Sequence, residues 1–206
     1  MLPYPGGPSW RHGGDETGRS GEVGTTLTGL AETVQAARRG EAEAWDTLFT
    51  RFHPDVHAYA LARLGDWASA EDVTQEVFAA AVSAIRRLRD DREPAVQAWF
   101  LHICRHKIID HLRRSERRRP PVASSQTAPD DPEQVVEARL LADELRAAMR
   151  GLTEDQRDVL IRRFVLDQPL EAVAGASRRS LGAVKSMQHR ALATLERVLG
   201  QVEAGG

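Results

Sequence analysis

Three side chains with metal-binding chemistry follow one another at four-residue spacing. His102, His106 and Asp110 share one stripe of a helix, because residues four positions apart lie one above the other. Two imidazoles and a carboxylate are ligands that zinc accepts. A zinc site also needs a further ligand and groups that orient the imidazoles, and this stripe lies inside a strongly basic segment. We therefore expect no metal and no other cofactor, with a metal-dependent helical enzyme as an alternative.

The single cysteine is a second candidate for chemistry. Cys104 lies between apolar neighbours, which favours a small buried hydrophobic group over a nucleophile or a redox sensor. The sequence has no glycine-rich phosphate loop and no nucleophile motif after a strand. We therefore expect no enzymatic activity and assign no catalytic residue.

Side chains that can contact nucleic acid gather in the segment 180–195. One face of this predicted helix carries Lys185, Ser186, His189 and Arg190 and no acid, while the opposite face is mostly apolar. A short helix, a tight turn and a longer helix with such a face form a helix-turn-helix, whose second helix enters the major groove. Lysine and arginine pair with guanine edges or phosphates, and serine and histidine hydrogen-bond to either. The segment therefore predicts contact with duplex DNA; a solvated basic face is the alternative.

A second basic segment runs from Arg105 to Arg119 and follows Trp99 and Phe100. Cations with neighbouring aromatic rings suit single-stranded or melted nucleic acid, because phosphates attract cations and unstacked bases need a surface to stack on. The alternative is a solvated helix end whose arginines favour the C-terminal dipole, with Trp99 in the core.

Composition limits the functions that these basic segments can have. The 206 residues are 41% hydrophobic and 28% charged, and the formal net charge of -2 excludes a protein that coats nucleic acid by bulk electrostatics. No apolar run approaches the length of a membrane span or a signal-peptide core, so we expect a cytoplasmic protein without membrane insertion.

The elements that must position these residues are all predicted to be helices. Apolar residues recur at helical intervals from Leu30 onward, interrupted by Gly40, Pro54 and Gly65. A further helix is predicted to begin with Ser69 as its N-cap. Its outer face carries Asp72, Gln75 and Glu76, and the last helix of this half runs from about Val96 to Arg114.

Composition divides the chain into two domains. Residues 1–29, rich in glycine and proline, are predicted to be a disordered arm, and 115–135 a flexible linker. Residues 30–114 form the first helical domain and 136–200 the second. In the second, Thr153 and Gln156 predict a capping box, and Pro169 fits a helix start.

Three stretches in this order resemble the two-domain bacterial sigma factors of the extracytoplasmic-function (ECF) class. They read AEDVTQEVFAAAVSAI, AWFLHICRHKIIDHLRR and LTEDQRDVLIRRFVLDQPLEAVAGASRRSLGAVKSMQHRALATL. The likeness covers about residues 41–114 and 136–199. It implies an all-α fold with a sigma region 2-like bundle and a sigma region 4-like helix-turn-helix domain.

The resemblance also implies which residues contact which partner. Core RNA polymerase would dock on Asp72, Gln75 and Glu76. The loop from Arg89 to Ala95 and the following helix would recognise and open the minus-ten element. Residues that this implies for minus-ten contact are Arg89, Arg92, Arg105, His106, Lys107, Arg113 and Arg114. Those implied for the minus-35 element are Arg178, Arg179, Lys185, Ser186, His189 and Arg190.

Further expectations follow from the same likeness. An anti-sigma factor would regulate the protein by covering both domains. Relatives usually have leucine and glycine where this chain has Ser177 and Arg178, so the turn must form without the residue that most easily takes positive φ. Met187 stands at a frequently basic position, which implies a changed base preference. The remaining alternative is a helix-turn-helix transcriptional regulator that does not act as a sigma subunit, with the N-terminal half as a dimerisation or sensor module.

Overall fold

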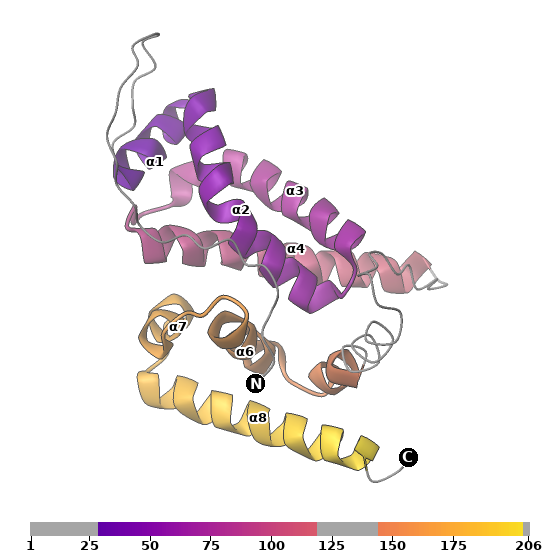
Figure 1. Cartoon of the computed structure of the whole chain (residues 1–206). Coiled ribbons are helices and arrows are strands. Elements are labelled where there is room, and N and C mark those ends of the chain that lie inside the picture. The colour runs from indigo at the N-terminus through magenta and orange to yellow at the C-terminus, as the bar shows by residue number, and fades with distance from the viewer. Residues whose placement is uncertain (1–28, 119–143, 204–206) are drawn as a thin grey trace, which may run out of the picture.

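A computed structural model describes residues 29–118 and 144–203, and every regular element in these ranges is helical (Figure 1). The first group of elements is α1 (Leu30–Arg39), α2 (Ala42–Leu64), α3 (Trp67–Ala84), the 3-10 helix η1 (Ile85–Arg87) and α4 (Glu93–Arg118). The second group comprises helical residues 144–150, α6 (Glu154–Phe164), α7 (Leu170–Ser177) and α8 (Leu181–Glu203). The predicted all-α fold is confirmed for these ranges.

Two predicted segments fall largely beyond the described part of the chain. The arm over 1–29 lies outside it except for Gly29, and the linker over 115–135 lies outside it after residue 118. Residues 115–118 continue α4, which therefore ends four residues later than predicted. Within the described ranges, no helix is both long and apolar enough to cross a membrane.

Aromatic rings fill the core between α2, α3 and α4. The ring of the fully buried Phe100 lies 5.2 Å from that of Phe52 on α2 and 5.0 Å from that of Phe78 on α3. Leu48 and Tyr59 on α2 are fully buried as well. Each such side chain contributes roughly 1.5–3 kcal/mol by leaving water, so these contacts fix the three helices against one another.

Pro54 lies inside α2, although the sequence predicted a break there. Proline removes one backbone hydrogen bond and costs about 3 kcal/mol in a helix interior. The buried side chains of Phe52 and Val56 on either side of it keep the helix packed on the core. Tertiary burial therefore outweighs the local penalty.

Helix starts also differ from the prediction in the first group. The N-cap of α3 is Asp66 rather than Ser69: its carboxylate accepts a hydrogen bond from the Ser69 backbone N–H at 2.8 Å. The predicted cap is wrong because Asp66, which is also a favoured N-cap residue, occurs three positions earlier and makes the capping hydrogen bond. Similarly, α4 begins at Glu93, since Pro94 is tolerated in a first helical turn.

The predicted helix starts of the second group are confirmed. Thr153 caps α6, accepting from the Gln156 backbone N–H at 3.3 Å, and the Gln156 side chain accepts from the Thr153 N–H at 2.9 Å. Pro169 precedes α7 directly, with φ −64°. Both signals are local to the helix start that they mark.

The two groups meet along α6 and α7, which lie between α4 and α8 (Figure 1). Ile161 of α6 is 2% exposed and belongs to the apolar cluster of the first group, with Met149 and Leu166 packed beside it. At the end of α2, Gly65 has φ +72°, and a Cβ there would lie 2.4 Å from Cδ of Arg146. Glycine is therefore required where the second group crosses the end of α2.

Candidate nucleic-acid interface

The exposed face of α8 presents the side chains predicted to contact duplex DNA. Lys185, Ser186, His189 and Arg190 are all exposed. The residues between them that face α6 and α7 are buried: Val184, Met187 and Ala191. The Arg190 guanidinium donates to the Ser186 carbonyl at 3.2 Å, so it lies along its own helix. The sequence thus predicted correctly which side of this helix is free.

Met187 does not lie on that face. Its side chain is 8% exposed and packs with Val159 and Val173 in the core of the second group. The expectation that it changes base preference is therefore wrong, because an inward-facing thioether cannot reach a base edge while α8 stays packed. Its unbranched chain instead fills the space between α6, α7 and α8.

The turn between α7 and α8 forms without glycine. Arg178 adopts the left-handed conformation, with φ 54° and ψ 38°, and its N–H donates to the Gly175 carbonyl at 3.3 Å. The Arg179 N–H donates to the Ala174 carbonyl at 3.0 Å, which closes the end of α7. A left-handed L-residue costs roughly 1–2 kcal/mol, which packing of the neighbouring helices offsets. Both arginine side chains are exposed at this turn.

The loop before α4 holds one predicted DNA-contacting arginine in a local pair. Arg92 donates from Nε to Asp90 Oδ1 at 3.0 Å and from Nη2 to Oδ2 at 2.5 Å. The Arg92 side chain, followed by its backbone N–H, lowers the pKa of Asp90 to about 2. Arg89 in the same loop is exposed. A phosphate that binds Arg92 must therefore replace the Asp90 carboxylate.

Glu76 brings together residues predicted for two different partners. Its carboxylate lies 3.5 Å from Lys107 Nζ and 3.0 Å from Arg114 Nη2, both on α4. Lys107 and Arg114 were predicted to contact DNA, and Glu76 to contact polymerase. His106 and Arg113, also on α4, are exposed.

The other two residues predicted to contact polymerase are open to solvent. Asp72 and Gln75 are exposed on α3, and the Gln75 amide donates to Glu71 Oε1 at 3.2 Å. Glu76 is half-buried, so the outer face of α3 is contributed mainly by Asp72 and Gln75.

The histidine stripe and Cys104 lie among contacts that suit a structural role rather than metal binding or reactivity. His106 Nδ1 lies 2.8 Å from the His102 carbonyl, and burial, followed by the charges of His106 and Arg105, lowers the pKa of His102. Over residues 29–118 and 144–203, no three His, Cys, Asp or Glu side chains are arranged to hold a metal ion. Cys104 is fully buried, and burial raises the pKa of its thiol to about 12.

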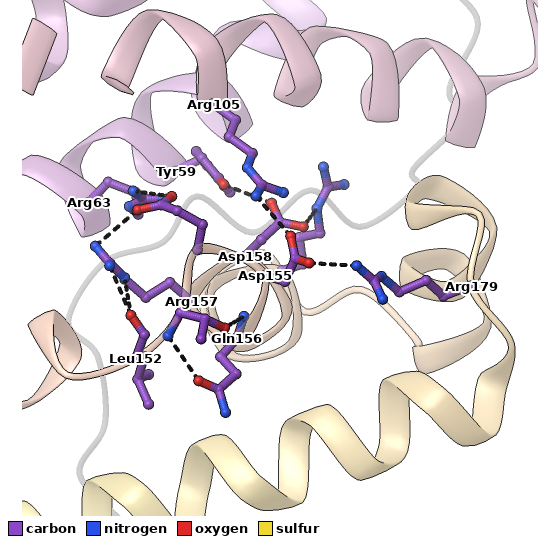
Figure 2. Close-up of polar contacts among 12 residues, drawn as sticks. Tyr59, Arg63, Arg105, Leu152, Asp155, Gln156, Arg157, Asp158 and Arg179 are labelled. Atoms are coloured by element: carbon purple, nitrogen blue, oxygen red, sulfur yellow. Dashed lines mark hydrogen bonds and ion pairs between the residues drawn. The ribbon is translucent and has the colours of Figure 1, made fainter. Parts of the chain in front are cut away.

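A polar network that the sequence did not predict joins α2, α4 and α6 (Figure 2). The buried Tyr59 hydroxyl donates to Asp158 Oδ1 at 2.7 Å, and Arg162 Nε donates to Oδ2 of the same carboxylate at 2.9 Å. Arg63, whose side chain is 1% exposed, pairs with Glu154 at 2.7 Å. Burial, followed by the Asp158 charge, raises the pKa of Tyr59, so its hydroxyl keeps the proton that it donates.

Asp155, at the start of α6, binds an arginine with each oxygen (Figure 2). Oδ1 accepts from Arg105 Nη2 at 2.8 Å, and Oδ2 accepts from Arg179 Nη2 at 2.5 Å. The hydrogen bond from Arg105 is the largest influence on this carboxyl and lowers the pKa of Asp155. The group is therefore ionised at neutral pH, and it joins two arginines predicted to contact different promoter elements.

A cleft of about 910 Å³ lies beside Asp155, between α4 and α7. Trp99, His102 and Arg105 line it from α4, and Arg178 and Arg179 line it from the turn before α8. Trp99 packs against Phe100 with 5.0 Å between ring centroids, which confirms its predicted packing role. Both predicted DNA-contacting regions thus face a common space.

The residues that the sequence missed gave only weak signals. Glu154 and Asp155 are acids in the first turn of a capped helix, which suits the helix dipole and suggests nothing further. Tyr59 occurs within an apolar pattern, as core tyrosines do. The partners that join these residues to the first group lie 50 or more positions away, so no local pattern pairs them.

Comparison with known proteins identifies both halves. Residues 48–118 match the family Sigma-70 region 2, and residues 142–195 match Sigma-70, region 4. The ECF RNA polymerase sigma factor SigD of Mycobacterium tuberculosis (strain H37Rv) is 32% identical over 185 residues, which are 86% of this chain and 84% of SigD. The chain belongs to the ECF sigma factors. The predicted family, the role in transcription initiation and the non-catalytic character are thereby confirmed.

Two solved structures share the fold of this sigma factor. CnrH, in a complex with the cytosolic domain of CnrY, aligns with a TM-score of 0.60 and 23% identity over 84% of this chain and 97% of CnrH. RpoE, in a complex with the anti-sigma factor NepR from Bartonella quintana, aligns with a TM-score of 0.54 and 18% identity over 77% of this chain and 98% of RpoE. Region 2 of this sigma factor spans most of α2, α3 and α4, and region 4 spans α6, α7 and most of α8.

Proposed function

We propose that this sigma factor recognises a promoter through two separate DNA contacts. In this proposal α8 reads the minus-35 element as duplex, using its exposed face and the two arginines of the preceding turn. The face comprises Lys185, Ser186, His189 and Arg190, and the turn contributes Arg178 and Arg179. The observation that supports this best is that α8 exposes cations over a buried apolar face, with no acid between Leu181 and Leu195.

The minus-ten element is assigned to the loop before α4 and to α4 itself. Exposed Arg89, His106 and Arg113 are free to meet phosphates of opened strands. Arg92 is held by Asp90, and Lys107 and Arg114 by Glu76, and these cations would exchange a carboxylate for a phosphate. Such exchange is favourable because DNA releases its counterions when cations replace them.

Core RNA polymerase is the proposed partner of α3, through Asp72, Gln75 and Glu76. Exposed acids suit a basic partner surface, and charge complementarity raises association rates. Since RpoE was solved with the anti-sigma factor NepR, we also propose an anti-sigma factor for this chain. Transcription initiation would place the protein in the cytoplasm.

Reconstituted transcription tests the proposed function. The purified chain, added to bacterial core polymerase and a promoter found by mapping transcript starts after overexpression, is expected to start RNA synthesis at a defined site. Substituting Lys185→Ala or Arg190→Ala should weaken binding of the promoter duplex by about 1–3 kcal/mol each. Arg197→Ala is the matched control, because Arg197 is an exposed cation farther along the same helix. Failure to initiate at any promoter would refute the proposal.

A second set of variants tests whether α3 and α8 bind different partners. Asp72→Asn together with Glu76→Gln should reduce polymerase association while leaving binding of promoter duplex by region 4 intact. The matched control is Glu43→Gln, an exposed acid on α2. If the α3 variant and the α8 variants lost the same activity, the assignment of separate surfaces would be wrong.

A further inference from the structure

Asp155 lies between α4 and the turn before α8, the two elements to which the proposed function assigns DNA contacts. Its two oxygens accept from Arg105 of α4 and Arg179 of the turn before α8, at 2.8 and 2.5 Å. A carboxylate that accepts from two guanidinium groups presents the same charge and acceptor geometry that arginine seeks in DNA phosphate. Under the proposed function, these two arginines serve different promoter elements, so one internal anion satisfies both.

The position of Asp155 is fixed by the contacts around it. It is the second residue of α6, where the capping box and the helix dipole favour a negative charge. On either side, Glu154 pairs with the buried Arg63 and Asp158 accepts from the buried Tyr59, while Ile161 anchors the same helix in the apolar core of the first group. Asp155 is therefore held in place while α6 is packed on the first group. When the two regions separate, Asp155 moves with region 4 and leaves Arg105, whereas Arg179 belongs to the same region as Asp155.

Both arginines face one cleft in the closed arrangement. The cleft between α4 and the turn before α8 has a volume of about 910 Å³, and Arg105 and Arg179 line it. Asp155 belongs to the same lining, which places it within reach of both guanidinium groups.

We propose that Asp155 is an internal phosphate mimic that latches region 2 and region 4 together through Arg105 and occupies Arg179 within region 4, so that the closed form withholds both arginines from DNA. The proposal rests on the proposed function for the identity of these arginines. Polyanion competes with Asp155 for both guanidinium groups, so DNA itself favours the open form. The apparent affinity for DNA is then the intrinsic affinity reduced by the fraction of open molecules.

Substitution of Asp155 tests the latch with DNA of random sequence. Asp155→Asn keeps the side-chain shape and removes the charge, so it is expected to raise affinity for a short random-sequence duplex by about threefold to tenfold. Glu171→Gln is the matched control, because Glu171 is also an acid in the first turn of a region 4 helix and lines the same cleft without a described ion pair. Equal effects of the two variants would show a simple charge effect and overturn the proposal.

The separation of the two regions provides an independent readout. Ser83→Cys on α3 and Ala193→Cys on α8 place dyes on exposed positions, and buried Cys104 stays unlabelled. Asp155→Asn, or added duplex, should lower energy transfer between the dyes, and Glu171→Gln should not. Unchanged transfer in the Asp155 variant and with duplex would refute the latch.

Two additions keep the test decisive. If Asp155→Asn loses helicity, Asp155→Ser replaces it, since serine is accepted in a first helical turn. Rising salt should also open the wild-type chain, because salt screens the ion pairs. Transcription by the wild-type chain separates the two hypotheses. A chain that initiates transcription but shows no effect of Asp155 refutes the latch alone, and a chain that opens but never initiates refutes the proposed function alone.

Discussion

The contacts inside the first group differ in kind from the contacts between the two groups. Phe100, Phe52 and Phe78 meet in a core without charges, whereas α6 meets α2 and α4 mainly through Tyr59–Asp158, Arg63–Glu154 and Arg105–Asp155. Apolar side chains cannot be transferred to water without a large loss of free energy. A partly exposed ion pair such as Arg105–Asp155 can be exchanged for other charges at little net cost. The first kind of contact maintains a fold, and the second allows two regions to separate.

Removing a core ring should have the largest effect on stability. Phe100→Ala is expected to lower the free energy of unfolding by about 3–5 kcal/mol, because it leaves a cavity between α2, α3 and α4. Denaturant unfolding measures the loss. Phe164→Ala is the control: this side chain is 61% exposed, and its removal should change stability by no more than about 0.5 kcal/mol. A small effect of Phe100→Ala would show that this apolar core does not supply the main stability of the first group.

Removing the buried carboxylate of Asp158 should have a smaller and more local effect on stability. Asp158 lies at the seam, the contact of α6 with α2 and α4. Asp158→Ala leaves the Tyr59 hydroxyl and Arg162 without their acceptor, a loss of about 1–3 kcal/mol in the free energy that holds α6 against α2. Water can reach these groups if α6 separates from α2, so the loss should stay local and the packing of α3 should be unaffected. Hydrogen exchange should therefore accelerate in α6 and stay unchanged in α3.

Tyr59→Phe sharpens the same comparison. It removes only the hydroxyl and leaves the Asp158–Arg162 pair, so we expect a loss of about 1 kcal/mol. Calorimetry of the two variants side by side measures the difference. If Tyr59→Phe were as damaging as Asp158→Ala, the hydrogen bond of Tyr59 rather than the Asp158–Arg162 pair would hold α6 against α2.

The smallest expected effect is a pH dependence at the edge of the first group. Burial, opposed by Glu71, lowers the pKa of His57, whose ring lies tilted against that of Trp67 with 4.4 Å between the centroids. Below its ordinary pKa of about 6.5, the unfolded chain binds this proton more readily than the folded chain does. The contribution is therefore present above that pH and lost as pH falls, by less than about 1 kcal/mol. His57→Gln should reduce the slope of unfolding free energy against pH below 6.5, and an unchanged slope would contradict this.

The sequence predicted most where the determining signal is local. The capping box at Thr153, the apolar face of α8 and its exposed cations were all predictable, because spacing within one helix decides them. Pro54 misled because the burial of its neighbours depends on other helices. Likeness to relatives, in which this position is frequently basic, did not predict that Met187 packs inward against Val159 and Val173.

The seam could not be predicted from the sequence. Tyr59 and Asp158 are 99 positions apart, and Arg105 and Asp155 are 50 apart. Charges of both signs occur throughout the chain, so many pairings were possible and composition could not select one. Family likeness assigned Arg105 and Arg179 to DNA, and only the folded geometry shows that they share one carboxylate.

The burial of Cys104 has a practical consequence. The only thiol in the chain lies under α2, with its sulfur 3.8 Å from the Val56 carbonyl, and ionises only far above neutral pH. Oxidants and alkylating reagents react with the thiolate of cysteine, so they can modify Cys104 only when region 2 itself opens. The rate of alkylation at Cys104 therefore reports the opening of region 2, and mass spectrometry can read it in crude extract without any added tag.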